Sequence, residues 1–199
     1  MANKKNKVKF NICNVHYALI TVAEDGTVAF ATPVPMPGAV SISMDPMGEP
    51  ESFYADGVEY YVINNNQGYD GDLELAMISE SFRTDILKEE ADANQVLVEN
   101  ANSETGSFAL LFEFDGDIRK IRHVLYNCSA SRPTIESKTN EEDKEVQTET
   151  LTVKARPMAS GYVKAKTGDS TTEEVYNNWY KYVYHPTTGE EAEATDENA

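Results

Sequence analysis

The feature that most constrains the fold is an alternating run of large apolar residues in the second half of the chain. Every second position carries an aromatic or aliphatic side chain: Phe108, Leu110, Phe112 and Phe114. This is the period of a β-strand that buries one face. Asp115-Gly116-Asp117 follows, and Asp-Gly readily turns a hairpin. A second run returns over 118–129, with one face formed by Val124, Tyr126 and Cys128.

The same period of two recurs along the rest of the chain. It predicts a hairpin over 15–30 that turns at Asp25-Gly26, and further strands at 39–44, 58–63, 73–78 and 146–155. One face of 39–44 is expected to hold Val40, Ile42 and Met44, and one face of 146–155 to hold Thr148, Thr150 and Thr152. Polar segments rich in Gly, Pro, Asn or acids are expected to be loops, at 45–57, 64–71, 91–106 and 136–145. We also expect Asp70-Gly71-Asp72 to form a turn.

Two segments favour helices. Residues 79–90 begin with Ser79, a good N-cap, and place Phe82 and Ile86 on one face. Residues 171–184 begin with a Thr171-x-x-Glu174 capping box, and Val175, Trp179 and Tyr182 fall on one helical face. The tyrosines of this segment also alternate as in a strand, and we favour a short helix. The sequence therefore predicts a mainly β fold, a β-sandwich or small barrel with one packed helix and a short C-terminal helix.

The length and net charge of the chain limit its domain organisation and its possible binding partners. The 199 residues suit one domain over 1–186, followed by an acidic tail over 187–199 that has no large apolar side chain and is expected to be mobile. The net charge of −17 opposes binding to nucleic acid or to an anionic membrane surface. No segment approaches the roughly 20 apolar residues of a membrane span. We expect a protein made in a reducing cytoplasm.

No arrangement of residues indicates catalysis. The three histidines, His16, His123 and His185, are scattered, and none has a Cys or His at metal-ligand spacing. Cys13 and Cys128 lie in apolar strand-like runs, which favours buried free thiols over a disulfide. We therefore expect no catalytic residue, no cofactor and no metal site. The residues alone predict an acidic, mainly β domain that is not an enzyme.

Several stretches resemble, in order, the major tail proteins of siphophages, the long-tailed phages with non-contractile tails. The resemblance covers roughly residues 8–186. Its motifs are N-V-H-Y-A at 14–18, P-G-A-V-S-I-S-M-D-P at 37–46, F-Y-A-D-G at 53–57, G-Y-D-G-D-L-E-L-A at 68–76, S-F-R-T-D-I-L at 81–87, F-A-L-L-F-E-F-D-G-D at 108–117, R-H-V-L-Y-N-C at 122–128 and Q-T-E-T-L-T-V at 147–153. Two positions differ, since Ser79 and Lys88 stand where the family has Pro and Gly beside the helix.

The resemblance implies a structural virion protein, a β-sandwich tail-tube subunit assembled in the cytoplasm of the bacterial host. Its copies would form hexameric rings that stack into a tube, together with tape-measure, tail-terminator and tail-tip proteins. DNA would pass through the tube without specific binding. An acidic bore would keep the phosphates from adhering, and the candidate lining residues are Glu59, Asp72, Glu74 and Glu149. The alternative is a monomeric carbohydrate-binding β-sandwich module that uses its aromatic side chains.

Overall fold

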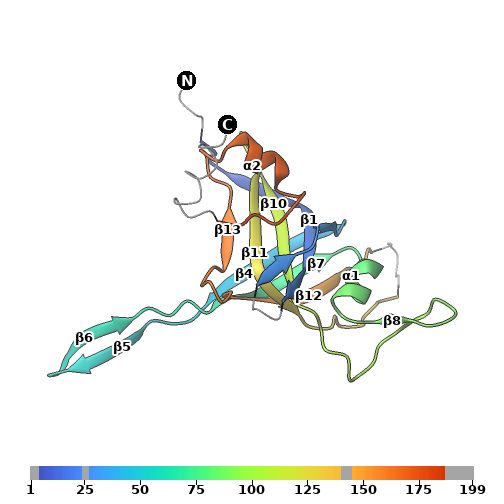
Figure 1. Cartoon of the computed structure of the whole chain (residues 1–199), viewed down its shortest axis with the longest axis horizontal. Helices are drawn as coiled ribbons and strands as arrows, with labels where there is room; N and C mark the ends of the chain where they lie inside the picture. Colours follow the sequence, from blue (N-terminus) through green and yellow to red (C-terminus); the bar gives the residue numbers. More distant parts are fainter. Residues whose placement is uncertain (1–4, 24–26, 140–144, 187–199) are drawn as a thin grey trace.

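The computed structural model describes residues 5–23, 27–139 and 145–186, and in these ranges the body is one nine-stranded antiparallel sheet (Figure 1). Its strands are β1 (Lys9–Val22), β2 (Val28–Phe30), β3 (Val34–Pro35), β4 (Ala39–Met47), β7 (Gly68–Leu75), β10 (Phe108–Gly116), β11 (Ile121–Ala130), β12 (Glu149–Arg156) and β13 (Lys164–Lys166). The strand order is β2-β1-β10-β11-β12-β7-β4, and β3 and β13 pair with β1 and β11. Two hairpins lie outside the sheet, β5 (Glu51–Ala55) with β6 (Val58–Ile63) and β8 (Glu90–Ala91) with β9 (Leu97–Val98). The helices are α1 (Glu80–Asp85) and α2 (Glu173–Asn178).

The sheet curls around a main hydrophobic core. Strands β1, β10, β11, β12, β7 and β4 contribute to this cluster together with α1, and its members include Tyr17, Leu73, Phe82, Leu110 and Leu151. β4, at one end of the order, also contacts β1. Opposite parts of one sheet therefore bury their inner faces against each other. The predicted mainly β fold with a packed helix is confirmed.

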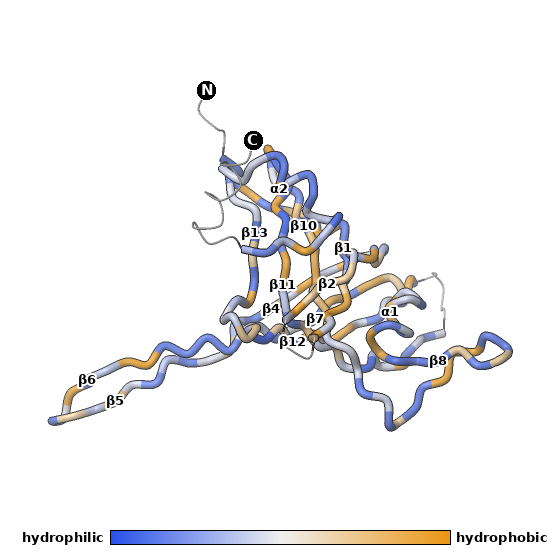
Figure 2. The backbone as a smooth tube through the Cα atoms, in the orientation of Figure 1, coloured by the Kyte–Doolittle hydropathy of each residue, from blue (hydrophilic) through white to orange (hydrophobic). Residues whose placement is uncertain are grey.

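A second hydrophobic cluster lies on the other face of β10 and β11. Here Ala109, Leu111 and Tyr126 pack with Trp179 and Val183, which follow α2. β10 is therefore buried on both faces, and Figure 2 shows hydrophobic residues along it and along β11. This explains why the odd positions Ala109 and Leu111 are apolar as well as the even ones.

The predicted hairpin over 108–129 is present with two corrections. β10 continues through Gly116, so the connection lies at 117–120 and not at Asp115-Gly116-Asp117. Val124 and Tyr126 face the second cluster, whereas Cys128 faces the main core. The prediction of one shared face was wrong because the register shifts between the pairs Phe108–Cys128 and Leu110–Leu125, and an extra residue reverses the side-chain alternation.

Both predicted helices form, and both are shorter than expected. The Ser79 hydroxyl caps α1 by accepting the N–H of Phe82 at 3.3 Å. α1 ends before residue 90, and Lys88 has φ +61°, a conformation that glycine adopts most easily. α2 is capped by Thr172 and not by Thr171. Tyr182 is exposed, because the chain leaves the helix after residue 178.

Three of the expected loops contain strands. β4 and β5 occupy part of 45–57, β8 and β9 lie within 90–98, and β7 begins inside 64–71. Asp70-Gly71-Asp72 is therefore in the middle of a strand and is not a turn. The predicted strand at 73–78 ends at Leu75, while those near 39–44, 58–63 and 146–155 are confirmed. Val40 is exposed and does not share a face with Ile42 and Met44, which pack against the main core. The prediction of one shared face was wrong because the register shifts between Ala39 and Ser41.

Some sequence predictions concern residues outside the described ranges. These are the turn at Asp25-Gly26, residues 140–144 of the expected 136–145 loop, and the acidic tail over 187–199. The hairpin over 15–30 is confirmed by the pairing of β1 with β2. No helix within the described ranges is long and apolar enough to cross a membrane.

Candidate assembly surfaces

A long β-hairpin, residues 48–67, leaves the body between β4 and β7 (Figure 1). We call it the arm. Its turn is Asp56-Gly57, where both residues have positive φ, +53° and +78°, as a tight hairpin turn requires. At its root Gly48 has φ +95°, and a Cβ there would lie 2.3 Å from the Asn65 carbonyl oxygen. The root therefore admits only glycine, which fixes where the two strands leave the sheet.

The arm exposes large apolar side chains on both of its faces. The exposed fractions are 58% for Phe53, 64% for Tyr54, 71% for Tyr60, 63% for Tyr61 and 49% for Ile63. Within the described chain, no hydrogen bond, ion pair or ring contact joins the side chains of 51–63 to the body. A two-stranded hairpin alone is marginally stable in water. Exposed apolar surface of this extent marks an interaction site.

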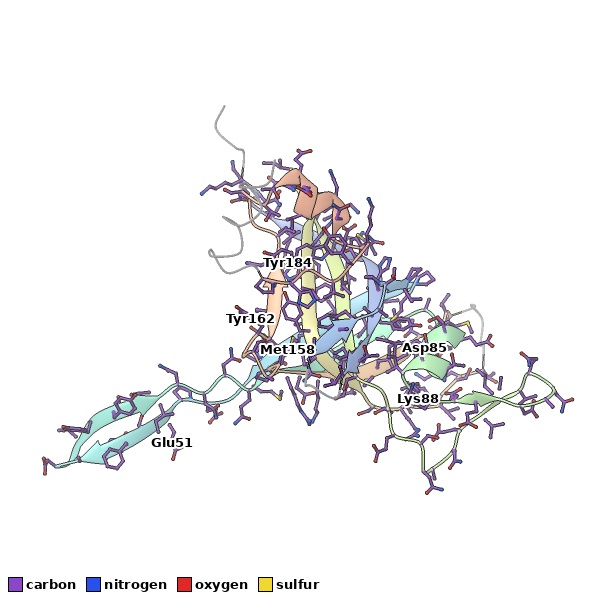
Figure 3. All side chains as sticks on the ribbon, viewed as in Figure 1. Glu51, Asp85, Lys88, Met158, Tyr162 and Tyr184 are labelled. Atoms are coloured by element: carbon purple, nitrogen blue, oxygen red, sulfur yellow. The ribbon has the colours of Figure 1, made fainter. Side chains whose placement is uncertain are left out.

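The arm is also acidic. Residues 48–67 contain Glu49, Glu51, Asp56 and Glu59 but no lysine or arginine. The side chain of Glu51 lies out on the arm, away from the body (Figure 3). Glu59 accepts a 2.6 Å hydrogen bond from the Ser52 hydroxyl across the hairpin. A partner for the arm must therefore offer both apolar and cationic groups.

The sequence contained a signal for this arm. The density of Pro and Gly over 45–57 favours a loop. Yet Asp56-Gly57 stands between two aromatic runs, Phe53-Tyr54 and Tyr60-Tyr61. Asp-Gly between such runs is a strong short-range hairpin pattern. What the pattern does not reveal is that the hairpin packs against nothing in its own chain.

The outer face of β4, β7 and β12 forms a second surface, which we call the polar strip. Acids of β7 lie between hydroxyl side chains of the two flanking strands, because Ser43 and Thr152 both lie opposite Asp72. The strip has no aromatic side chain. Its members are Ser41, Ser43, Asp45, Asp70, Asp72, Glu74, Thr148, Thr150, Thr152, Lys154 and Arg156.

Hydrogen bonds hold the carboxylates of the polar strip in place. Glu74 accepts bonds from the hydroxyls of Thr148 at 2.7 Å and Ser41 at 2.8 Å. These bonds lower the pKa of the Glu74 carboxyl, Thr148 having the larger effect, so the group is ionised at neutral pH. Asp72 accepts a bond from Thr152 at 2.8 Å. Asp72 and Glu74 therefore present oriented negative charge at one end of the strip, whereas Lys154 and Arg156 lie toward its other end.

The structure brings together two of the four predicted bore residues. Asp72 and Glu74 share the polar strip. Glu149 belongs to the opposite, inner face of β12, where it accepts bonds from Arg83 at 2.6 Å and from the Ile78 N–H at 2.6 Å. It thereby holds α1 against the sheet. Glu59 lies on the arm.

A buried ionic cluster ties α2 to the sheet. Glu113 on β10 is only 3% exposed, and it accepts hydrogen bonds from Lys120 at 2.8 Å, Arg122 at 3.1 Å and Tyr180 at 3.4 Å. The Arg122 guanidinium also lies 3.8 Å from the ring centre of Tyr176. A buried carboxylate with these partners is compensated. The cluster joins the segment 176–180 to β10 and β11.

The cysteines and histidines do not form a site. Cys13 and Cys128 are free thiols, one half-buried and one buried. Burial raises the pKa of the Cys13 thiol, so it is protonated at neutral pH. Within the described ranges, no group of three His, Cys, Asp or Glu side chains is arranged to hold a metal ion.

No protein-family model and no curated protein sequence matches this chain. Among solved structures, the fold is similar to the tube-terminating cap of an anti-feeding prophage, determined by cryo-EM. The match has 9% sequence identity and a TM-score of 0.43, and it covers 84% of this chain and 98% of that chain. A similarity of this strength carries no conclusion about function.

Proposed function

We propose that this chain is the major tail-tube subunit of a long, non-contractile phage tail, which assembles into stacked hexameric rings around a DNA-conducting channel. One observation carries the proposal. The arm exposes Phe53, Tyr54, Tyr60 and Tyr61 to water and has no partner in the described part of its own chain. Such a surface is consistent with a contact between subunits. The motifs that resemble siphophage tail proteins supply the identity of the assembly.

The polar strip supports the proposed channel. A surface that lines a DNA passage has to be hydrophilic and has to avoid cationic contacts that accumulate along the tube. Asp72 and Glu74 provide negative charge, and the serines and threonines beside them provide a hydrated surface. The proposed lining therefore centres on Asp72 and Glu74. Glu149 is engaged by Arg83, and Glu59 belongs to the arm.

Assembly of the purified protein tests the proposal. The concentrated protein should form rings or tubes in negative-stain micrographs and should sediment as a polymer. Replacing Phe53 and Tyr61, which lie opposite each other on the arm, with serine should abolish the polymer. It should leave the denaturant midpoint unchanged, because these side chains are exposed and pack on nothing in the body.

A matched control is Tyr182→Ser, which removes an exposed aromatic side chain from a different surface. This variant should assemble like the unmodified protein. A protein that stays monomeric at high concentration and high salt, and binds a polysaccharide, would instead establish the carbohydrate-binding module. Assembly that survives removal of both arm aromatics would remove the observation on which the proposal rests.

A further inference from the structure

Three lysines gather on one surface without an anionic partner. Lys9 lies on β1, while Lys164 and Lys166 lie on β13 opposite Leu125 and His123 of β11. All three are exposed. None of them forms an ion pair with another residue in the described ranges. On a chain of net charge −17, an unpaired cationic cluster is unexpected.

Aromatic rings hold two of these ammonium groups in place. The Lys9 Nζ lies 4.6 Å from the ring centre of Phe114, and the Lys164 Nζ lies 4.1 Å from that of Tyr69. Phe114 also contacts the ring of His123. Cations over aromatic faces are attracted to the ring quadrupole. We call Lys9, Lys164, Lys166, Tyr69 and Phe114 the lysine patch.

Several other described surfaces carry acids, or cations that are already paired with acids. The polar strip carries Asp72 and Glu74, and the β8–β9 hairpin carries Glu90 and Asp92. Five cations elsewhere are engaged in ion pairs with acids: Arg83, Lys120, Arg122, Arg132 and Lys154. Others, such as Lys88, Lys138 and Lys181, are exposed and form no ion pair with another described residue. The lysine patch combines three lysines without an ion pair with two aromatic rings, and so complements the acidic, aromatic arm in both charge and ring content.

The arm of the same chain does not fold back onto this patch. Figure 1 shows the arm leaving the body near β4 and β7 and running away from β13. Its acids and aromatic rings are thus presented to another molecule. The occupant that fits the patch in both charge and ring content is the arm of a second copy.

We propose that the lysine patch of one subunit receives the acidic, aromatic arm of the next subunit. This inference rests on the proposed tube assembly, for which it specifies the contact. Carboxylates of Glu51, Asp56 and Glu59 meet the ammonium groups, and the arm's tyrosine rings cover the apolar stems of the lysines. Because arm and patch are different surfaces, the contact is head-to-tail and propagates from copy to copy.

A charge-exchange experiment tests the contact. One variant reverses the patch and the other reverses the arm: Lys9→Glu, Lys164→Glu and Lys166→Glu in the first, and Glu51→Lys, Asp56→Lys and Glu59→Lys in the second. Each variant alone should raise the critical concentration for assembly by at least about tenfold. This corresponds to a loss of roughly 1.4 kcal/mol in the free energy of subunit association. An equimolar mixture should assemble, since each arm then faces a patch of opposite charge.

A third variant controls for net charge. It introduces three Lys→Glu changes at exposed positions away from the patch, namely Lys88, Lys138 and Lys181. It should assemble like the unmodified protein. Circular dichroism and denaturant melts check that every variant is folded.

The outcomes separate this contact from the proposed function. An unmodified protein that never assembles overturns the tube assignment itself. If it assembles and the patch variant does so equally well, the tube assignment stands and the patch proposal fails. If both variants fail and their mixture fails as well, arm and patch do not meet. A patch variant that assembles normally but loses retention of duplex DNA would assign the lysines to nucleic acid instead.

Discussion

At the scale of single residues, the surroundings of His123 change the pKa of its side chain. Its ring is stacked on Phe112 with an interplanar angle of 1°. Burial, together with repulsion from Lys166, Lys9 and Lys164, lowers the pKa of His123 to about 4 from an ordinary value of 6.5. The native protein therefore takes up this proton at lower pH than the unfolded chain does.

This difference predicts a pH-dependent stability. Above pH 6.5 the side chain is neutral in both states; between pH 6.5 and 4 only the unfolded chain is protonated, so the free energy of unfolding falls as pH falls. The loss should reach at most roughly 3 kcal/mol. Urea unfolding from pH 7 to 4 should show a smaller decrease for His123→Gln than for the unmodified protein. The exposed His185→Gln should follow the unmodified protein, and equal decreases in all three would refute the assignment.

At the scale of elements, β7 depends on a glycine that the sequence presents as part of a turn. β7 lies between β12 and β4, and Gly71 pairs with Val153 on one side and Met44 on the other. A Cβ at Gly71 would lie 1.9 Å from the carbonyl oxygen of Ser43. The close approach of two backbones is the reason for glycine here.

Gly71→Ala should therefore separate β7 from β4. The expected cost is about 3 kcal/mol or more, in the range of severe backbone clashes. Gly168→Ala is the control, because a Cβ there meets nothing within 4 Å, and it should cost less than about 0.5 kcal/mol. Chemical denaturation of both variants provides the measurement. A loss below about 1 kcal/mol for Gly71→Ala would mean that the two strands are farther apart than described.

At the scale of the whole molecule, charge is unevenly distributed. Acids dominate the arm and the polar strip, while unpaired lysines gather at β1 and β13. In the proposed tube this separation places negative charge along the channel and opposite charges at subunit contacts. Attraction at the contacts then offsets the repulsion between subunits that each carry a net charge of −17.

The channel assignment predicts an effect on DNA passage. In an infectious particle, Asp72→Lys with Glu74→Lys should leave tubes intact but slow or stop DNA ejection, because cationic contacts to phosphate repeat along the tube. Glu80→Lys, an exposed charge change on α1, should eject normally. Dye fluorescence from released DNA gives the rate. Normal ejection through structurally normal double-variant tubes would place Asp72 and Glu74 away from the channel.

The sequence alone determined the features that depend on near neighbours in the chain. The alternation from Phe108 to Phe114 predicted β10, and the Ser79 cap predicted the start of α1. The alternating threonines Thr148, Thr150 and Thr152 predicted that these side chains share one face. These signals are local because side-chain period and capping are properties of a few consecutive residues.

Only the tertiary structure decided which distant side chains share a surface. A single extra residue in β11 moved Cys128 to the other core, and the pairing of β12 with β7 placed Glu74 beside Thr148 while turning Glu149 toward Arg83. Register between strands far apart in sequence sets these faces, and a shift of one residue reverses them. The lysine patch likewise exists only because β1 and β13 flank the β10–β11 pair.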